Sequence, residues 1–227
     1  PGEIPAKRID EVRAQPDRIL YLVDKPGAEQ SVIFAGQLIP PRATADDIAI
    51  EAMNDVLGGQ FTARLNMNLR EDKHWSYGAY SMAQDARGQR ALLAYAAVQS
   101  DKTAESLKEI RNEIKDIATT RPASADEVAL VKRSNILSLP GQWETGAAVL
   151  GSISKLVEFG LPDTYWAGYA DAVRSLTPEQ VNQAARDHLQ PEGLVFVVVG
   201  DRKVIDPGLK ALGFDAIQLV DTDGELL

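Results

Sequence analysis

Apolar and polar positions alternate in four short segments of the first hundred residues, which are 18–24, 31–39, 76–85 and 90–98. A period of two in runs rich in β-branched and aromatic residues predicts strands. Residues 25–28 (Lys-Pro-Gly-Ala) form a turn sequence, so the first two strands are expected to pair as a hairpin. The last two are expected to be antiparallel partners. A continuous apolar run at 194–199 predicts a buried strand, and 217–220 an edge strand.

A period near 3.6 residues predicts helices between these strands. The clearest one begins at Thr103 and carries a single apolar stripe, which consists of Leu107, Ile110, Ile114 and Ile117. Phe61, Leu65 and Leu69 are spaced by four residues, which places them on one face of another helix. Capping-box sequences start two more, at Thr44 with Asp47 and at Ser124 with Glu127. Thr177, followed by Pro178 at the first helical position, starts a third. The expected helices are 44–59, 61–72, 103–117, 124–139, 141–159, 177–188 and 206–213.

Strand pairs interspersed with helices predict an α+β fold, in which helices cover one face of an antiparallel or mixed sheet. Residues 1–17 are polar and interrupted by proline, as in a linker or an extended lead-in. Residues 18–227 are expected to form one domain. Because the chain begins with Pro instead of Met, we interpret it as a fragment of a longer protein.

Composition narrows the class of protein. Lys and Arg number 24 and Asp and Glu 33, so the formal net charge is −9. This balance argues against a nucleic-acid partner, because phosphate contacts need a basic face. The longest purely apolar run, 194–199, is far too short to span a membrane. The chain has no cysteine, which excludes disulfides and thiolate metal sites and fits the cytoplasm and the bacterial periplasm equally well.

Catalytic motifs are missing from the sequence. The two histidines, His74 and His188, stand in neither orientation of a zinc-peptidase motif, and we interpret His188 as a cation at a helix C-terminus. No serine lies in a Gly-x-Ser-x-Gly elbow, so an independent hydrolase has no motif behind it. Gly58-Gly59 is interpreted as a helix stop. Asp46-Asp47 and Glu71-Asp72 are interpreted as charged helix positions.

One segment, residues 58–78, carries a denser pattern. In order along the chain it contains Gly58-Gly59, Phe61-x-x-Arg64-Leu65, Leu69-Arg70-Glu71, Lys73, and Tyr77 at the start of a predicted strand. The segment resembles the C-terminal half-domain of pitrilysin- and insulinase-type zinc metallopeptidases, which include the mitochondrial processing peptidases. Residues 139–145, 159–162 and 197–201 resemble further parts of that half-domain, so the resemblance covers residues 18–205. His74 and Trp75 depart from the family pattern at their turn.

The resemblance implies a division of labour between two half-domains that close over a peptide. The N-terminal half of these peptidases binds zinc through an inverted His-x-x-Glu-His motif and a distal Glu, and the C-terminal half lacks those ligands. This chain is therefore expected to bind no metal or cofactor and to be inactive alone, with zinc on a partner domain or subunit. Whether that partner is covalently linked, and whether the chain forms a dimer, stays open.

The resemblance also singles out two residues of this chain. Arg70 and Tyr77 stand where the family has an Arg and a Tyr that face the zinc across the chamber. An arginine is cationic and a tyrosine is protonated near neutral pH, so both donate hydrogen bonds to a substrate backbone or to a carbonyl oxygen that gains negative charge. A helix end and the start of the next strand should bring the two donors beside one turn. On pattern alone, such an arginine is solvated and such a tyrosine half-buried.

A second hypothesis is a structural or interaction subunit of the same fold with no proteolytic role. Related proteins in respiratory complexes keep the fold without the chemistry. Retention of Arg70 and Tyr77 favours the working peptidase, because a scaffold has no need for that pair. The expected substrate is an extended peptide, and an exposed strand edge would add main-chain pairing to its binding.

Overall fold

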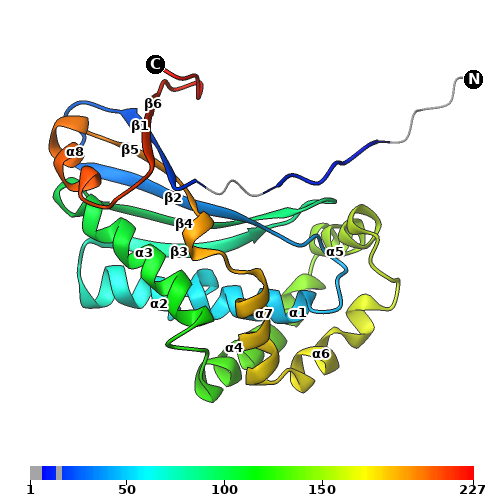
Figure 1. Ribbon diagram of the computed structural model, residues 1–227. Coiled ribbons are helices and arrows are strands. Elements are labelled where there is room, and N and C mark those ends of the chain that lie inside the picture. The colour runs from blue at the N-terminus through cyan, green and yellow to red at the C-terminus, as the bar shows by residue number, and fades with distance from the viewer. Residues whose placement is uncertain (1–6, 14–16) are drawn as a thin grey trace, which may run out of the picture.

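The structure of the chain, a computed structural model, describes residues 7–13 and 17–227. Within these ranges six strands form one mixed sheet, and helices cover one of its faces (Figure 1). The chain is therefore an α+β protein, as the sequence predicts. Of the expected lead-in over residues 1–17, positions 1–6 and 14–16 lie outside the described residues. Residues 7–13 belong to no helix or strand, and the Val12 amide donates a hydrogen bond to Gln89.

The strands are β1 (Ile19–Asp24), β2 (Gln30–Ile39), β3 (Ser76–Gln84), β4 (Arg90–Gln99), β5 (Val195–Gly200) and β6 (Ala216–Val220). Their order in the sheet is β3-β4-β2-β5-β1-β6. β3 and β4 are antiparallel partners and β6 is an edge strand, as predicted. β3, which carries Tyr77, forms the opposite edge.

The predicted hairpin of the first two strands is wrong. β5 lies between β1 and β2, parallel to β1 and antiparallel to β2. The turn at residues 25–28 does form, but it passes over the end of β5, where the Lys25 amide donates to the Gly200 carbonyl and the Gly27 amide to the Asp201 carboxylate. β5 is apolar throughout, and a place between two strands buries that side-chain pattern better than an edge does.

The helices are α1 (Asp47–Asn54), α2 (Arg64–Asn66), α3 (Thr103–Ala118), α4 (Ala125–Ser138), α5 (Gly146–Phe159), α6 (Tyr165–Ser175), α7 (Pro178–His188) and α8 (Arg202–Lys210). α1 and α2 each continue into a π-helical turn, Asp55–Gly59 and Met67–Asp72. α6 has no counterpart among the predicted helices. The predicted starts of α5 and α8 are wrong, because Thr145 and Asp201 are the residues that cap these helices.

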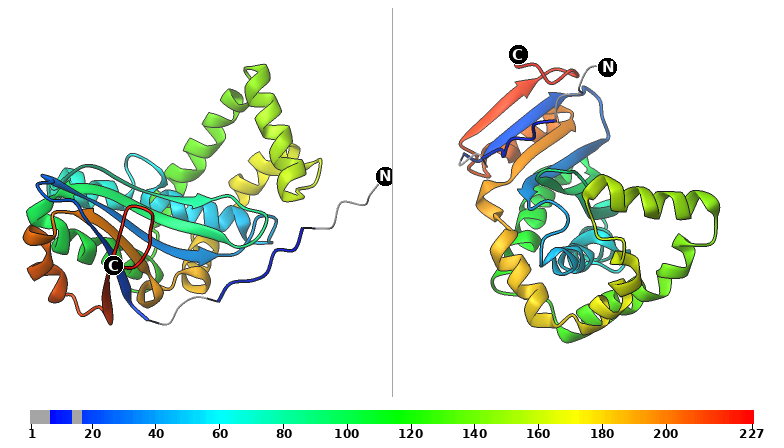
Figure 2. Two further views of the ribbon diagram at one scale, coloured as in Figure 1. Left: turned by 90° about the horizontal axis from the view of Figure 1, so that it is seen from above. Right: turned by 90° about the vertical axis from the view of Figure 1, so that its right-hand side faces the viewer.

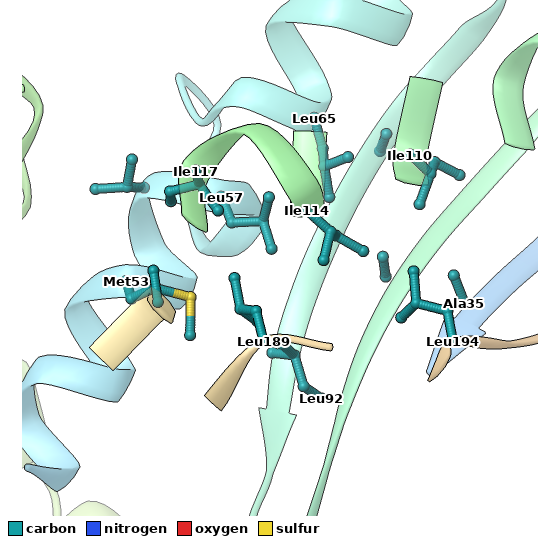
Figure 3. Packing of buried hydrophobic residues seen from close by; sticks show 14 of the residues in the cluster. Ala35, Met53, Leu57, Leu65, Leu92, Ile110, Ile114, Ile117, Leu189 and Leu194 are labelled. Atoms are coloured by element: carbon teal, nitrogen blue, oxygen red, sulfur yellow. The ribbon is translucent and has the colours of Figure 1, made fainter. Parts of the chain in front are cut away.

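The core lies between the helix layer and the sheet. All four residues of the predicted α3 stripe are buried, and Figure 3 shows Ile110, Ile114 and Ile117 gathered with Leu57 and Leu65. The predicted capping box of α4 is present, and α7 starts after Thr177 as predicted, with Pro178 in its first turn and a capping box between Thr177 and Gln180. Reciprocal capping bonds and a matched apolar stripe are local features, which explains why a sequence pattern predicts them.

Five charged side chains meet between α1 and the β3–β4 hairpin. Arg90 is fully buried and forms ion pairs with Asp47 and Glu51, while Arg42 pairs with both carboxylates and with Asp85. Burial raises the pKa of Asp47 and of Glu51 and outweighs the two guanidinium groups, which lower it. Asp47 was expected in a capping box with Thr44 and as a charged helix position, but α1 has no side-chain capping bond. Asp47 is instead buried, because its carboxylate turns to the two arginines.

Apolar side chains also remain outside the core. Figure 2 shows the hairpin of α4 and α5 (green) projecting beyond the sheet. Its exposed apolar residues are Leu130, Leu137, Leu150, Ile153 and Val157. On the helix-free face of the sheet, the Tyr95 ring packs against Phe34 and Tyr80, with centroid distances of 5.1 Å and 4.8 Å. Across residues 7–13 and 17–227, no helix combines the length and apolar character that crossing a membrane requires.

Arg64 ties α2 to the start of α4. Its buried guanidinium donates to both carboxylate oxygens of Glu127 and to the carbonyl groups of Arg121 and Pro122. Burial alone would raise the pKa of Glu127, but hydrogen bonds from Arg64 and from the Ser124 amide outweigh it and hold the pKa at about 2. The pair therefore fixes the helix layer beside the segment that carries Arg70.

We predict that Glu127→Gln destabilises the protein at pH 7 and flattens its acid dependence. The pKa of Glu127 is lower in the folded chain (about 2) than its ordinary value of 4.5, so the pair stabilises above pH 4.5 and is lost as the pH falls towards 2. Urea unfolding followed by circular dichroism between pH 7 and 2.5 measures this difference. Glu29→Gln, at an exposed carboxylate, is the control. Equal pH profiles for Glu127→Gln and the unaltered chain would contradict the prediction.

Candidate functional site

The structure brings Arg70 and Tyr77 together. Arg70 belongs to the π-helical turn after α2, and Tyr77 is the second residue of β3. The Arg70 Cζ atom lies over the Tyr77 ring, 5.3 Å from its centroid. The Tyr77 residue is 88% exposed and the Arg70 side chain 29% exposed, so both reach solvent at the β3 edge of the sheet.

The ring of Phe61 also contacts the Arg70 guanidinium. The Arg70 Cζ atom is 4.6 Å from the Phe61 ring centroid, and Phe61 is 65% exposed. The predicted placement of Phe61 on one helical face with Leu65 and Leu69 is wrong, and of the three only Leu65 and Leu69 are buried. α2 begins only at Arg64, so Phe61 stands in the preceding turn and not on the helical stripe.

The buried amide of Asn66 joins the two backbone segments that carry these rings. Its Nδ2 donates to the Phe61 carbonyl at 2.7 Å, and its Oδ1 accepts from the Ala79 amide at 3.2 Å. One side chain thus spans the turn before α2 and the start of β3. The position of Phe61 relative to Tyr77 is therefore set by hydrogen bonds as well as by packing.

An irregularity at the start of β3 presents Tyr77 to solvent. The register between β3 and β4 shifts between Ser76 and Ala79. The Ser76 hydroxyl oxygen accepts from the Gly78 amide at 3.1 Å and lies 2.6 Å from the Ala97 carbonyl oxygen, to which it donates. These bonds bridge the break in the ladder, as expected where a bulge redirects a side chain.

The turn between Arg70 and Tyr77 has a left-handed residue at His74, with φ 57°. The His74 amide donates to the Arg70 carbonyl, and its ring Nδ1 lies 3.0 Å from the same oxygen. His74 is exposed, whereas Trp75 is half-buried against the core. The partly exposed Lys73 side chain lies 3.6 Å from a Glu109 carboxylate oxygen. This turn fixes the backbone on both sides of the site.

Gly58 and Gly59, expected as a helix stop, end the first π-helical turn in a different way. A Cβ atom on Gly58 would collide with the backbone nitrogen and the hydroxyl of Ser81 in β3. Gly59 would meet the Asp55 carboxylate. Close approach, and not a left-handed C-cap, is thus what requires glycine here, since neither residue has a positive φ.

His188 lies far from Arg70 and joins other elements. It ends α7, as predicted, and its Nε2 forms a hydrogen bond with the carboxylate of Asp46 before α1. Burial alone would raise the pKa of Asp46, but hydrogen bonds from His188 and Thr44 outweigh it and lower the pKa. In the part of the chain that the structure describes, no three His, Asp or Glu side chains cluster closely enough to hold a metal ion. The donor set for zinc is thus missing from these residues.

Comparison with known proteins agrees with the fold. The family model described as the peptidase M16 inactive domain matches residues 2–135, more than half of the chain. Among solved structures, the peptidase M16 inactive domain from Pseudomonas fluorescens has a TM-score of 0.77 at 24% identity, covering 86% of this chain and 46% of that chain. A protease from Helicobacter pylori has a TM-score of 0.77 at 18% identity, covering 88% and 47%.

A third solved structure is shorter. It is the inactive peptidase domain of a candidate zinc protease from Bordetella parapertussis, with a TM-score of 0.66 at 15% identity, covering 77% of this chain and 94% of that chain. The present chain thus spans about half the length of the first two structures and nearly all of the third. No curated protein sequence matches it.

We predict that Gly58→Ala destabilises the protein by about 1–3 kcal/mol, because the added methyl group has to push the first π-helical turn away from β3. Thermal and urea unfolding measure the change. Gly151→Ala in α5 is the matched control, since its Cβ would meet open space and alanine favours a helix by about 0.5–1 kcal/mol. Equal stability of the two variants would show that the close approach at Ser81 costs nothing.

Proposed function

Since the chain belongs to the family of peptidase M16 inactive domains, we propose that it is the zinc-free half of a zinc metalloendopeptidase. In this proposal it closes over a zinc-bearing domain or subunit and holds an extended peptide between the two. The observation that carries the proposal is the contact between Arg70 and Tyr77, two hydrogen-bond donors at one exposed edge of the sheet.

The free donor groups of this pair suit a peptide carbonyl. Among the described residues, the Arg70 side chain has one ionic partner, the Glu71 carboxylate at 3.4 Å from Nε, and its two terminal nitrogens have no hydrogen-bond partner. Tyr77 is exposed, and its hydroxyl is a second donor beside the guanidinium. A cation and a hydroxyl aimed at one oxygen stabilise negative charge there as a bond to its carbon forms. The metal and the attacking water belong to the other domain.

Exposed apolar surface supports closure over a second domain. The α4–α5 hairpin carries apolar side chains in solvent, and the helix-free face of the sheet carries an aromatic cluster. Contiguous exposed apolar surface is typical of protein interfaces. The two longer solved structures contain about as much chain again as the part that this protein matches.

Side-chain donors, more than strand pairing, carry the proposed grip on the peptide. β3 is an edge strand, but the Asn66 side chain accepts from the Ala79 amide, and Gly58 packs against the Ser81 amide. Two of the amides along β3 are therefore covered from within the chain. Only the remaining backbone groups of β3 could then pair with the main chain of a peptide.

We predict that Arg70→Ala and Tyr77→Phe each lower kcat/KM for peptide cleavage about 100-fold in the complex with the zinc-bearing partner, as expected for one lost donor. Tyr80→Phe, on the same strand but on the helix-free face, and Arg202→Ala, on exposed α8, are the matched controls. Circular dichroism checks that each variant is folded.

Two outcomes would overturn the proposal. Full activity in both variants would remove the assigned roles, and a partner that binds this chain without any peptide cleavage would favour the structural subunit. Zinc content is a further check. The chain alone, dialysed against zinc and then buffer, should retain far less than one equivalent by atomic absorption, and stoichiometric zinc would contradict the proposed division between the domains.

A further inference from the structure

We infer that Phe61 is a positioning residue for Arg70, holding the guanidinium beside Tyr77 so that its terminal nitrogens face outward. This inference rests on the proposed function for its catalytic consequence, but its structural part stands on the contacts alone. Phe61 is a large aromatic residue in a turn, 65% exposed, and its ring nevertheless contacts a charged group from another turn. Burial in the core therefore does not explain why position 61 carries an aromatic residue.

The Phe61 ring is close to the guanidinium and is mostly outside the core. Arg70 Cζ lies closer to the Phe61 centroid, at 4.6 Å, than to the Tyr77 centroid, at 5.3 Å. Both are within the range of a cation–π contact. A planar guanidinium over a ring keeps its N–H bonds near its own plane, so the ring faces restrict the rotamer and leave the N–H edge for a hydrogen-bond acceptor.

The backbone around Phe61 is built to hold the ring in place. Its carbonyl accepts from the buried amide of Asn66, and the other end of that amide accepts from Ala79, two residues after Tyr77. The Ala63 amide donates to the Gln60 carbonyl and closes the turn that carries Phe61. The backbone segments of the two rings that contact Arg70 are thereby connected through one side chain that is hydrogen-bonded at both ends. A ring held in this way restricts the Arg70 side chain before substrate binds. Less side-chain entropy is then lost when the peptide binds.

Other charges near the guanidinium do not explain its position. The ion pair with Glu71 joins adjacent residues at 3.4 Å, and the Glu71 side chain is 42% exposed, so solvent weakens it. Without Phe61, the long Arg70 side chain would sample more rotamers beside Tyr77. Loss of the Phe61 ring should therefore weaken the interaction between the guanidinium and the peptide. It should change the stability of the fold little, because Phe61 buries little surface.

The first test uses Arg70 itself as the reporter, in the chain alone. The side-chain protons of Arg70 should show upfield ring-current shifts in NMR spectra, and these should diminish in Phe61→Leu and persist in Phe61→Trp. Phe34→Leu, which removes a ring of the helix-free face, is the control and should leave Arg70 unchanged. Unchanged Arg70 resonances in Phe61→Leu would overturn the inference, whether or not the protein is a peptidase.

The second test measures cleavage in the complex with the zinc-bearing partner. An exposed cation–π contact corresponds to about a fivefold change, so Phe61→Leu should lower kcat/KM about fivefold and Phe61→Trp should restore it. The effect should vanish in an Arg70→Ala background, because no guanidinium remains to be positioned. An equal loss in that background would assign Phe61 a direct contact with the peptide and overturn the positioning role.

Discussion

The close approach between Gly58 and the Ser81 backbone sets the spacing between the helix layer and the edge strand β3. A side chain at position 58 would force these two elements apart. The same segment continues through Phe61 and α2 to the π-helical turn that carries Arg70, so its distance from β3 decides whether Arg70 reaches Tyr77. Arg64 secures the outer side of this segment through Glu127. The missing Cβ atom of Gly58 and the partly buried ion pair of Arg64 with Glu127 thus both hold the segment that carries Arg70.

Features that depend on neighbours in the sequence were predictable, and features that depend on distant partners were not. The α3 stripe and the capping boxes at Ser124 and Thr177 follow from spacing alone. The insertion of β5 between β1 and β2 depends on which strand best buries an apolar run, which no local pattern states. The burial of Asp47 likewise depends on Arg90, more than forty positions away. The contact of Phe61 with Arg70 does not follow from the four-residue spacing, because α2 begins only at Arg64 and Phe61 lies in the turn before it.

Arg64 and Arg70 show how environment separates two residues of one type. Both belong to the segment whose pattern resembles the family, and they stand six positions apart. Arg64 is buried and uses its nitrogens on Glu127 and two carbonyl groups, so its contribution is to stability. Arg70 is held by aromatic rings that take none of its hydrogen bonds, so its donors stay free for another molecule. Both arginines belong to the same sequence pattern, and only their surroundings in the structure distinguish their roles.

The bridge made by Asn66 has a consequence for how the site forms. Phe61, Asn66, Arg70, Tyr77 and Ala79 all lie within one short stretch of chain, so every contact between them closes a small loop. Small loops cost little entropy and form early, ahead of the long-range pairing of β1 with β5. The site around Arg70 is therefore a unit of low contact order, able to acquire its shape before the sheet around it is complete.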